Sequence, residues 1–456
     1  MSAYDPILYS RMLTELTLAF HILFATIGVG VPVMIALAEW TGIRRSDPHY
    51  LLLARRWARG FVITVAVGVV TGTAIGLQLS LLWPSFMQIA GQAIALPLFM
   101  ETFAFFFEAI FLGIYLYTWD RFKHQMTHFL LMIPVMIGSS ASAVFITIVN
   151  AFMNTPQGFR LDGNKIVDID PILAMLNPAT PTKVAHVLTS AYMTSAFVLA
   201  SITAYALLKK RDHIYYRKAL RLTMGAALVF SIATGVVGDF SGKFLAEYQP
   251  EKLAAAEWHF ETSTQAPLVF GGILTENNEI KYGLELPYAL SILAKDDPNG
   301  EVTGLNELPP DERPPLIVHY FFDGMVAIGG FLIVLGLAYA WWSWRNRRLE
   351  ALKPEKTKLP RWLLRTTVWS GPLALLAIEL GWIFAEVGRQ PWILRGYMRT
   401  SEGATTSAHV DTMLLVFCAL YLVLGITSVR VLTRMFRNND AIDELRTRGI
   451  EGGLPK

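Results

Sequence analysis

Two pairs of glutamates lie inside strongly apolar stretches of the sequence. Glu101 and Glu108 form one pair, and Glu379 and Glu386 form the other, with the two members seven positions apart in both. Seven residues make about two turns of an α-helix, so each pair would share one helix face, about 10 Å apart along the axis. Such carboxylates suit proton transfer or metal ligation, and paired structural hydrogen bonds are the alternative explanation.

Two histidines and one methionine are further candidates for metal ligands. His21 and His186 fall in apolar stretches, where a lone histidine can equally be a packing residue with satisfied hydrogen bonds. Met325 would by default fill the core, since the chain has 16 methionines. A His/Met pair is, however, the axial ligand set of low-spin haems with a raised reduction potential. Spacing alone cannot pair two residues so far apart in the sequence.

These side chains need helices that hold them inside a lipid bilayer. The chain has 456 residues, of which 53% are hydrophobic and only 16% are charged, whereas soluble domains carry about 25% charged residues. Nine apolar stretches are long enough to cross a hydrocarbon core about 30 Å thick. The sequence therefore predicts an all-α, polytopic membrane protein. The nine stretches lie near 13–38, 60–82, 95–118, 128–150, 184–208, 222–240, 317–342, 366–388 and 410–432.

Basic residues are distributed unevenly between the two sides of the predicted bundle. Most of the 39 Lys and Arg residues follow the first, third, fifth, seventh and ninth stretches. The positive-inside rule then predicts an outer N-terminus and a cytoplasmic C-terminus, and an odd number of spans requires the same difference. Five polar side chains would converge in the outer half of the membrane, which predicts one buried site. They are His21, Glu101, His186, Asp323 and Glu386.

The same pattern divides the chain into four parts. A long connection between the sixth and seventh spans is rich in Pro, Gly, Glu and Asp towards its end, and connections of this length are usually functional or disordered. The predicted parts are 1–240 with spans 1–6, 241–316 as an extracytoplasmic loop, 317–434 with spans 7–9, and 435–456 as a cytoplasmic tail.

Several segments together resemble subunit I of cytochrome bd-type quinol oxidases with a short quinol-binding loop. GWIFAEVGRQPW resembles the signature of that family, and QPEKLAAAE lies at the start of its quinol loop. The resemblance covers essentially the whole chain and includes RMLTELTLAFHILFATIGVG, METFAFFFEAIFLGIYLYTWDRF, SAVFITIVNAFMNTPQGF and AHVLTSAYMTSAF.

The resemblance implies three haems and their ligands. His186 and Met325 would be the axial ligands of a low-spin haem b that accepts electrons from quinol. His21 and Glu386 would each ligate one haem of a high-spin pair, consisting of a haem b and a haem d, or a third haem b in place of haem d. Arg389 would hold a haem propionate or balance the local charge.

The resemblance also implies residues for quinol and for protons. Lys252 and Glu257 would contact quinol in the outer loop, while Glu101 and Glu108 would belong to the proton route. Two positions depart from the family pattern. Asp323 stands where many relatives carry Arg, and the ring of Trp258 could narrow the quinone site or stack on the quinone.

The implied protein is a terminal oxidase in a bacterial or archaeal cytoplasmic membrane. It would oxidise quinol on the outer side and reduce O2 to water with cytoplasmic protons, which generates a proton motive force without pumping. Its expected partners are a second large membrane subunit (subunit II), a small single-helix subunit, quinol, O2 and the lipid bilayer, and no nucleic acid is expected. The choice between menaquinol and ubiquinol stays open.

Two other functional classes deserve comparison. A haem b quinol dehydrogenase subunit would pass electrons onward without reducing O2, and would need His186 and Met325 but neither His21 nor Glu386. A proton-coupled transporter would use the carboxylates without haem and predicts inverted repeats with broken helices at the midplane. The carboxylates cluster towards the outer side instead, which disfavours the transporter.

Overall fold

The computed structural model describes residues 4–163, 165–209, 212–352 and 358–449. Within these ranges, nine helices are long and apolar enough to cross a membrane. This finding confirms the predicted all-α, multi-pass architecture with nine spans. The helices are α1 (Pro6–Arg45), α2 (Pro48–Leu82), α3 (Pro84–Tyr117), α5 (Met132–Asn154), α7 (Thr180–Leu208), α8 (Ile214–Tyr248), α11 (Val318–Leu352), α12 (Arg361–Val387) and α14 (Val410–Asn438).

Most of the helices are longer than the apolar stretches that predict them. Asp5 and Asp47 each precede a proline that is the first residue of a helix, and each side chain accepts hydrogen bonds from the amides of the first turn. An aspartate at the N-cap and a proline at the first helical position both favour initiation. The first two helices therefore begin well before the apolar stretches near 13–38 and 60–82.

The long connection begins later than position 241. α8 continues to Tyr248, and the short helix α9 (Pro250–Ala256) follows after a single residue. Gly242 lies against α10 (Ala289–Lys295), since a Cβ at Gly242 would come 2.6 Å from Leu293 Cδ1. The end of α8 thus stays helical beyond its apolar stretch because it packs against the connection itself.

The connection 249–317 is folded and has its own small core. Two antiparallel hairpins pair β3 (Leu268–Phe270) with β6 (Leu284–Leu286) and β4 (Ile273–Leu274) with β5 (Ile280–Lys281). Buried apolar side chains of α9, α10 and the hairpins join those of α8, α11 and α12 in one cluster. This cluster fixes the connection on the ends of three membrane helices.

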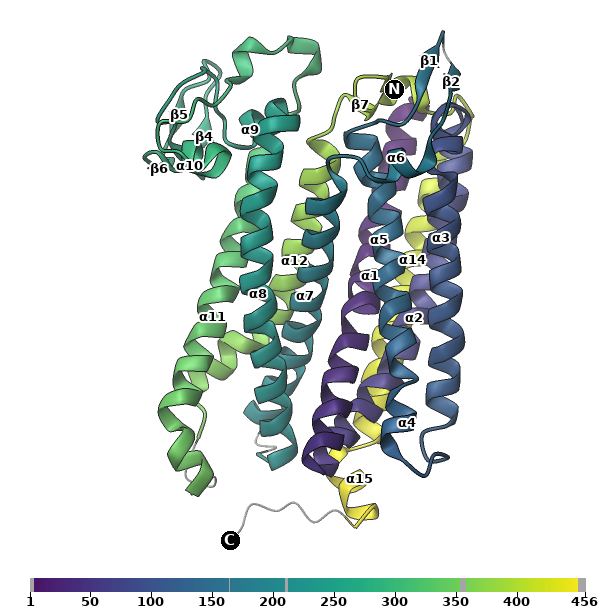
Figure 1. Cartoon of the computed structure of the whole chain (residues 1–456), viewed down its shortest axis with the longest axis vertical. Coiled ribbons are helices and arrows are strands. Elements are labelled where there is room, and N and C mark those ends of the chain that lie inside the picture. The colour runs from purple at the N-terminus through teal and green to yellow at the C-terminus, as the bar shows by residue number, and fades with distance from the viewer. Residues whose placement is uncertain (1–3, 164, 210–211, 353–357, 450–456) are drawn as a thin grey trace.

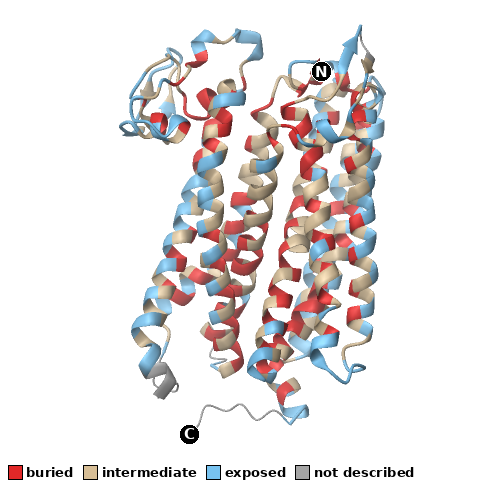
Figure 2. Cartoon of the chain, viewed as in Figure 1, coloured by how far each residue is buried: buried red, intermediate tan, exposed pale blue. Residues whose placement is uncertain are grey.

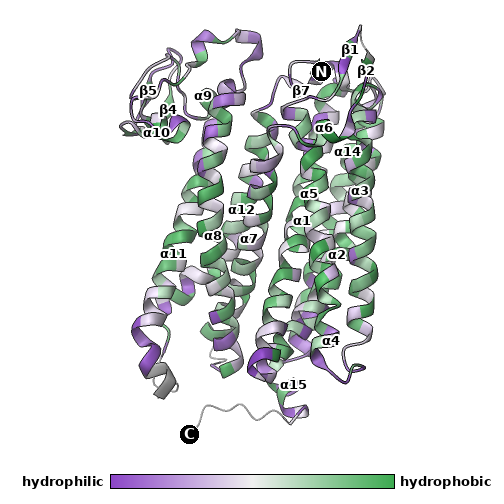
Figure 3. Ribbon diagram, viewed as in Figure 1, coloured by the Kyte–Doolittle hydropathy of each residue, from purple (hydrophilic) through white to green (hydrophobic). Residues whose placement is uncertain are grey.

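The two ends of the bundle differ in character. The connection 249–317 and the N-terminus lie at one end, which we call the loop end (Figure 1). The opposite end, which we call the basic end, carries α4 (Gln125–Phe129) and α15 (Ala441–Thr447). Apolar residues cover the helices between the ends, and polar residues gather at both ends (Figure 3). Buried residues lie mainly on the sides where helices face one another (Figure 2).

Helix α7 connects two groups of helices. α8 and α12 each pack against both α7 and α11, and α1 and α5 also pack against α7. On the far side of α1 and α5 lie α2, α3 and α14 (Figure 1). Shorter elements close the connections. They are β1 (Arg160–Asp162), β2 (Lys165–Val167), α6 (Pro171–Met175), β7 (Trp392–Leu394), β8 (Met398–Arg399) and α13 (Thr400–Gly403), together with the 3-10 turns η1 (Leu305–Glu307) and η2 (Pro310–Glu312).

Candidate functional site

Glu386, near the end of α12, is the centre of a polar network that joins three helices. Its Oε1 accepts a hydrogen bond from Asn150 Nδ2 of α5 at 2.5 Å, and its Oε2 accepts one from Arg389 Nη2 at 2.5 Å. Asn150 Oδ1 in turn accepts from Lys183 Nζ of α7 at 2.7 Å. Arg389 is buried, and its Nε and Nη1 have no hydrogen-bond partner among the residues that the structure describes. Two unpaired donors of a buried guanidinium suit an anionic group, such as a haem propionate.

His21 of α1 is held in the orientation of a metal ligand. Its Nδ1 lies 2.8 Å from Thr71 Oγ1 of α2, and the Thr71 hydroxyl donates its own hydrogen to Val67 O. Thr71 can therefore only accept from His21, so the proton sits on Nδ1 and leaves Nε2 free as a ligand atom. A Cβ at Gly72 would come 3.2 Å from His21 Cε1. Glycine at this position therefore leaves room for the imidazole ring.

His186 and Met325 lie on helices that face each other across a four-helix group. His186 is on α7 and Met325 on α11, and α8 and α12 pack against both. The Nδ1 of His186 is buried without a hydrogen-bond partner. A Cβ at Gly381 of α12 would come 2.9 Å from Met325 Sδ, and one at Gly238 of α8 would come 3.8 Å from His186 Cε1. Glycines beside both side chains, and an imidazole without a protein partner, fit a bound haem with these two axial ligands.

The glutamates of α3 face α5. Glu101 Oε1 accepts a hydrogen bond from Ser142 Oγ at 2.9 Å. Glu108 is buried, and a Cβ at Gly138 would come 3.0 Å from Glu108 Cβ, so glycine lets α5 approach closely. Both carboxyls thus lie at one interface, as their spacing predicts. Glu379, on α12, has a buried Oε1 without a partner.

Lys252 of α9 lies against the carboxyl end of α12. Its Nζ donates to Ala385 O at 2.9 Å and lies 4.9 Å from the centre of the Phe384 ring. The last carbonyls of a helix favour a cation, so the ammonium stabilises the end of the helix that carries Glu386. Burial lowers the pKa of Lys252 to about 7, while the charge of Glu386 opposes that shift.

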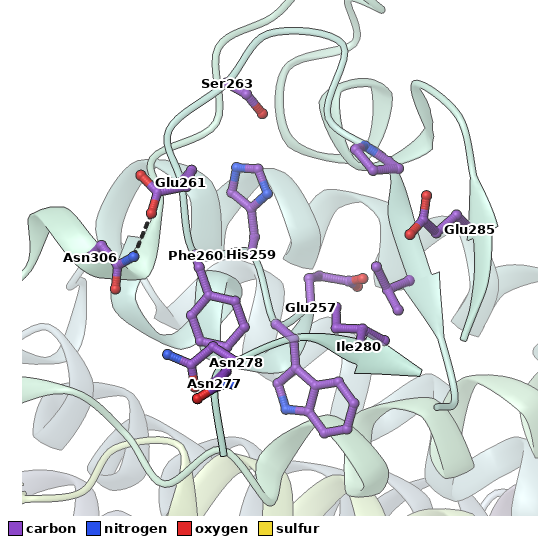
Figure 4. Close-up of a pocket in the computed structure, with 13 residues that line it drawn as sticks. Glu257, His259, Phe260, Glu261, Ser263, Asn277, Asn278, Ile280, Glu285 and Asn306 are labelled. Atoms are coloured by element: carbon purple, nitrogen blue, oxygen red, sulfur yellow. Dashed lines mark hydrogen bonds between the residues drawn. The ribbon is translucent and has the colours of Figure 1, made fainter. Parts of the chain in front are cut away.

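Glu257, at the end of α9, is fully buried, and within the described part of the chain neither of its carboxyl oxygens has a hydrogen-bond partner. Burial raises its pKa to about 8, and the negative charge of Asp323 adds to the shift. Glu257 lines a pocket of about 480 Å³ (Figure 4), whereas Lys252 is not among the lining residues. An unpaired carboxyl in a pocket wall is placed to accept a proton from a bound molecule. The other lining residues are Trp258, His259, Phe260, Glu261, Ser263, Pro267, Val269, Asn277, Asn278, Ile280, Glu285 and Asn306.

His319 of α11 contacts the residue that precedes Glu257. Its Nδ1 lies 2.6 Å from Ala256 O, and its Nε2 lies 3.0 Å from Gly271 O and 3.2 Å from Asp323 Oδ2. The ring thus lies between two backbone carbonyls and the Asp323 carboxyl, and Asp323 also accepts the Gly271 N–H at 2.5 Å. Asp323 therefore anchors the loop to α11, which gives this departure from the family pattern a structural role.

Trp258 lines the same pocket as Glu257. Its ring stacks on His319, with ring centres 3.8 Å apart, and its Nε1 donates to Leu316 O at 2.9 Å. The side chain is buried in these contacts. One face of the indole is therefore occupied by the His319 ring.

Several polar residues of the site were not predicted from the sequence. Asn150 and Lys183 were missed, although their positions in the sequence could have pointed to them. Asn150 is a polar residue at the end of an apolar stretch, and Lys183 precedes His186 by one helical turn. Thr71 gives no signal, since a threonine in an apolar helix usually bonds its own backbone. His319 lies at the edge of the seventh span, where a histidine can be interfacial.

Comparisons with known proteins agree over nearly the whole chain. The family model described as "Cytochrome bd terminal oxidase subunit I" matches residues 9–440. The chain is 42% identical over 448 residues to the "Putative cytochrome bd menaquinol oxidase subunit I" of Bacillus subtilis (strain 168), covering 97% of this chain and 99% of that one. It is 31% identical over 437 residues to the "Cytochrome bd ubiquinol oxidase subunit 1" of the same strain, covering 92% and 91%. A solved structure, "The structure of bd oxidase from Geobacillus thermodenitrificans", matches with a TM-score of 0.90 and 68% identity, covering 96% of this chain and 100% of that one.

Proposed function

Because the chain belongs to the family of cytochrome bd terminal oxidase subunit I, we propose that it oxidises quinol at the loop end and supplies the site where O2 is reduced to water. The family identifies it as a multi-pass cytoplasmic membrane protein and a subunit of a quinol oxidase. The observation that carries the proposal is the buried Glu386–Arg389 pair, whose guanidinium keeps two unpaired donors.

We infer a ligand set of four residues for three haems. His186 and Met325 hold a low-spin haem b, and His21 and Glu386 each hold one high-spin haem, a haem b and a haem d or third haem b. The proton on His21 Nδ1, fixed by Thr71, and the missing partner of His186 Nδ1 support this assignment. Bound haems would supply electron transfer and a place for O2 to bind.

We infer that the pocket beside Glu257 receives the quinol headgroup. The unpaired carboxyl takes a proton from the quinol hydroxyl, and the pocket opens at the loop end, so the proton leaves there. The excess of Lys and Arg at the basic end supports a cytoplasmic location for that end. Quinol protons would then be released outside, while Glu101 and Glu108 bring cytoplasmic protons to the oxygen site. Electrons and protons would reach that site from opposite sides, which builds a proton motive force without a pump.

The protein would act in a complex. A second large membrane subunit and a small single-helix subunit are the expected partners. The apolar faces of α2, α3 and α14, with exposed residues such as Leu77, Phe103 and Leu415, offer the surface for a membrane partner or lipid.

The proposed function is tested on the purified complex. We expect extraction to give about three haems per chain and quinol to support O2 uptake, with water as the product. One haem per chain without O2 uptake would favour the quinol dehydrogenase alternative.

Glu257→Gln should slow quinol oxidation by about 10²-fold, since general base catalysis commonly contributes 10²–10⁴-fold. The wild-type rate should rise with pH up to about 8, as the carboxyl loses its proton, because burial raises its pKa to about that value. This limb of the pH profile should disappear in the variant. The measurement is quinol oxidation against pH, with haem spectra recorded in parallel.

Glu261→Gln is the matched control, since Glu261 lines the same pocket but is exposed and hydrogen-bonded to Asn306. It should keep the wild-type rate and pH profile. An artificial donor that bypasses quinol should support full O2 reduction in Glu257→Gln. Equal loss with both donors would remove Glu257 from the quinol site.

A further inference from the structure

Three titratable side chains from three helices meet inside the basic end of the bundle. Glu39 of α1 accepts a hydrogen bond from the Tyr115 hydroxyl of α3 at 2.7 Å, and its other oxygen lies 2.7 Å from His128 Nδ1. His128 Nε2 lies 2.9 Å from Tyr115 O. The three residues are 2%, 0% and 3% exposed, in the order Glu39, Tyr115, His128. We call them the Glu39 cluster.

The hydrogen-bond geometry of the Glu39 cluster requires a proton between His128 and Glu39. The two ring nitrogens of His128 face the Glu39 carboxyl and the Tyr115 carbonyl. The carbonyl only accepts, so Nε2 donates its hydrogen to it. The contact of 2.7 Å between Nδ1 and Glu39 Oε1 then needs one further proton, which either group can carry. The Nδ1 proton lies between two groups that can both hold it.

The Glu39 cluster continues the line of glutamates along α3. Tyr115 follows Glu108 by seven residues, and Glu108 follows Glu101 by seven. Positions seven apart drift by only about 20° around a helix, so all three side chains share one face, in steps of about 10 Å. Ser142 and Gly138 of α5 flank Glu101 and Glu108 on this face. The line thus runs from the level of Glu101 to the basic end.

A purely structural role for the Glu39 cluster is to tie α4 to α1 and α3. Buried ion pairs are a poor way to do so, because apolar side chains of similar volume are often as stabilising or better. The surroundings are already apolar and aromatic: the His128 ring stacks on Tyr115 at 4.4 Å and meets the edge of Trp119 at 4.7 Å. Above Trp119, Arg55 pairs with Asp120 at the surface. The Glu39 cluster consists of three groups that can carry protons, and it lies in line with Glu101 and Glu108. This composition favours proton transfer over a purely structural role.

We propose that the Glu39 cluster is the station at which protons from the basic end enter the line towards Glu108 and Glu101. This inference rests on the proposed oxidase function and names where its proton route begins. His128 Nδ1 gives its proton to Glu39, Glu39 passes it to water between Tyr115 and Glu108, and His128 takes a replacement from solvent at the basic end. Water must bridge the step of about 10 Å, since it exceeds one hydrogen bond.

The test is Glu39→Gln in the complete complex with its partner subunits, reconstituted in vesicles. Glutamine can still accept from the Tyr115 hydroxyl but cannot carry a proton. We expect proton uptake and O2 reduction to slow at least tenfold in a single turnover of the reduced enzyme. Haem content, haem spectra and the thermal midpoint should stay at wild-type values. Anaerobic haem reduction by quinol should also be unchanged.

Three variants complete the test. Glu39→Asp keeps a titratable carboxyl and should recover most of the rate, while Tyr115→Phe, which keeps the ring and removes the hydroxyl, should slow uptake. Glu444→Gln is the control at the same end, because Glu444 pairs with Arg56 and Arg59 away from α3, and it should behave as wild type.

Wild-type uptake in Glu39→Gln overturns the proposal. So does an equal slowing in Glu39→Asp together with a lower thermal midpoint, since that result is expected of a structural tie. If Glu39→Gln does not assemble, wild-type uptake in Tyr115→Phe overturns it in the same way. Failure of the oxidase proposal itself looks different, because the wild-type complex would then not reduce O2.

Discussion

Met325→Leu is expected to abolish the low-spin haem spectrum and to reduce quinol oxidation by at least about 10²-fold. Leucine and methionine have similar volumes, and such exchanges usually cost less than about 1.5 kcal/mol, so the fold should persist. The thioether, however, would be the second axial ligand beside His186, and leucine has no donor atom. The measurement is the reduced-minus-oxidised visible spectrum of the purified complex, together with quinol oxidation.

Met193→Leu is the matched control for this substitution. Met193 is buried on α7, the helix that carries His186, and its substitution is the same chemical change at a position that is not a proposed ligand. It should retain both the spectrum and the activity. If the low-spin bands persisted unchanged in Met325→Leu, Met325 would be core packing and the second ligand would have to be sought elsewhere.

The nine spans could be predicted because a bilayer imposes a length and a near absence of charge on each helix. The helix ends could not be predicted from hydropathy, because capping and packing extend the helices past the hydrocarbon core. Asp5 and Asp47 cap helices that begin outside the apolar stretches. α8 extends past its apolar stretch, and Gly242 in this extension packs against α10. The fold within 249–317 was likewise out of reach, since its hairpins are short and depend on contacts with α11.

The candidate ligands were assigned by resemblance, and the structure adds the side chains that orient them. Thr71 fixes the tautomer of His21 from α2, and Asn150 binds Glu386 from α5. These partners are distant in sequence, so neither periodicity nor spacing could have identified them. The His319 ring contacts carbonyls of two other segments, which only the folded chain brings together.

Lys252 and Glu257 were expected to act together on quinol, yet they point to different places. Lys252 reaches the end of α12 beside Glu386, whereas Glu257 lines the pocket. Lys252 thus connects the loop to the helix of a proposed haem ligand. A substitution at Lys252 should therefore change the spectrum of the haem at Glu386 as well as quinol oxidation, which separates its role from that of Glu257.

Glu108→Gln is expected to slow O2 reduction and proton uptake by about 10²-fold, within the range usual for loss of a proton-transferring group. Glu108 lies two helical turns nearer the basic end than Glu101 on the same face of α3, between Glu101 and the Glu39 cluster. It is buried at the α3–α5 interface, where Gly138 lets α5 approach closely. Glutamine keeps the shape of the side chain, so haem content and haem reduction by quinol should be spared.

Charge separation in vesicles measures this effect most directly. The wild-type complex should build a potential as electrons from the loop end and protons from the basic end meet, and Glu108→Gln should build it about as slowly as it reduces O2. Glu379→Gln is the control, because Glu379 is also an intramembrane carboxyl with a buried, unpaired oxygen but lies on α12. The opposite result would be wild-type turnover in Glu108→Gln and slow turnover in Glu379→Gln. It would place the proton route at α12 instead of the α3–α5 interface, and the Glu39 cluster would then not lie on that route.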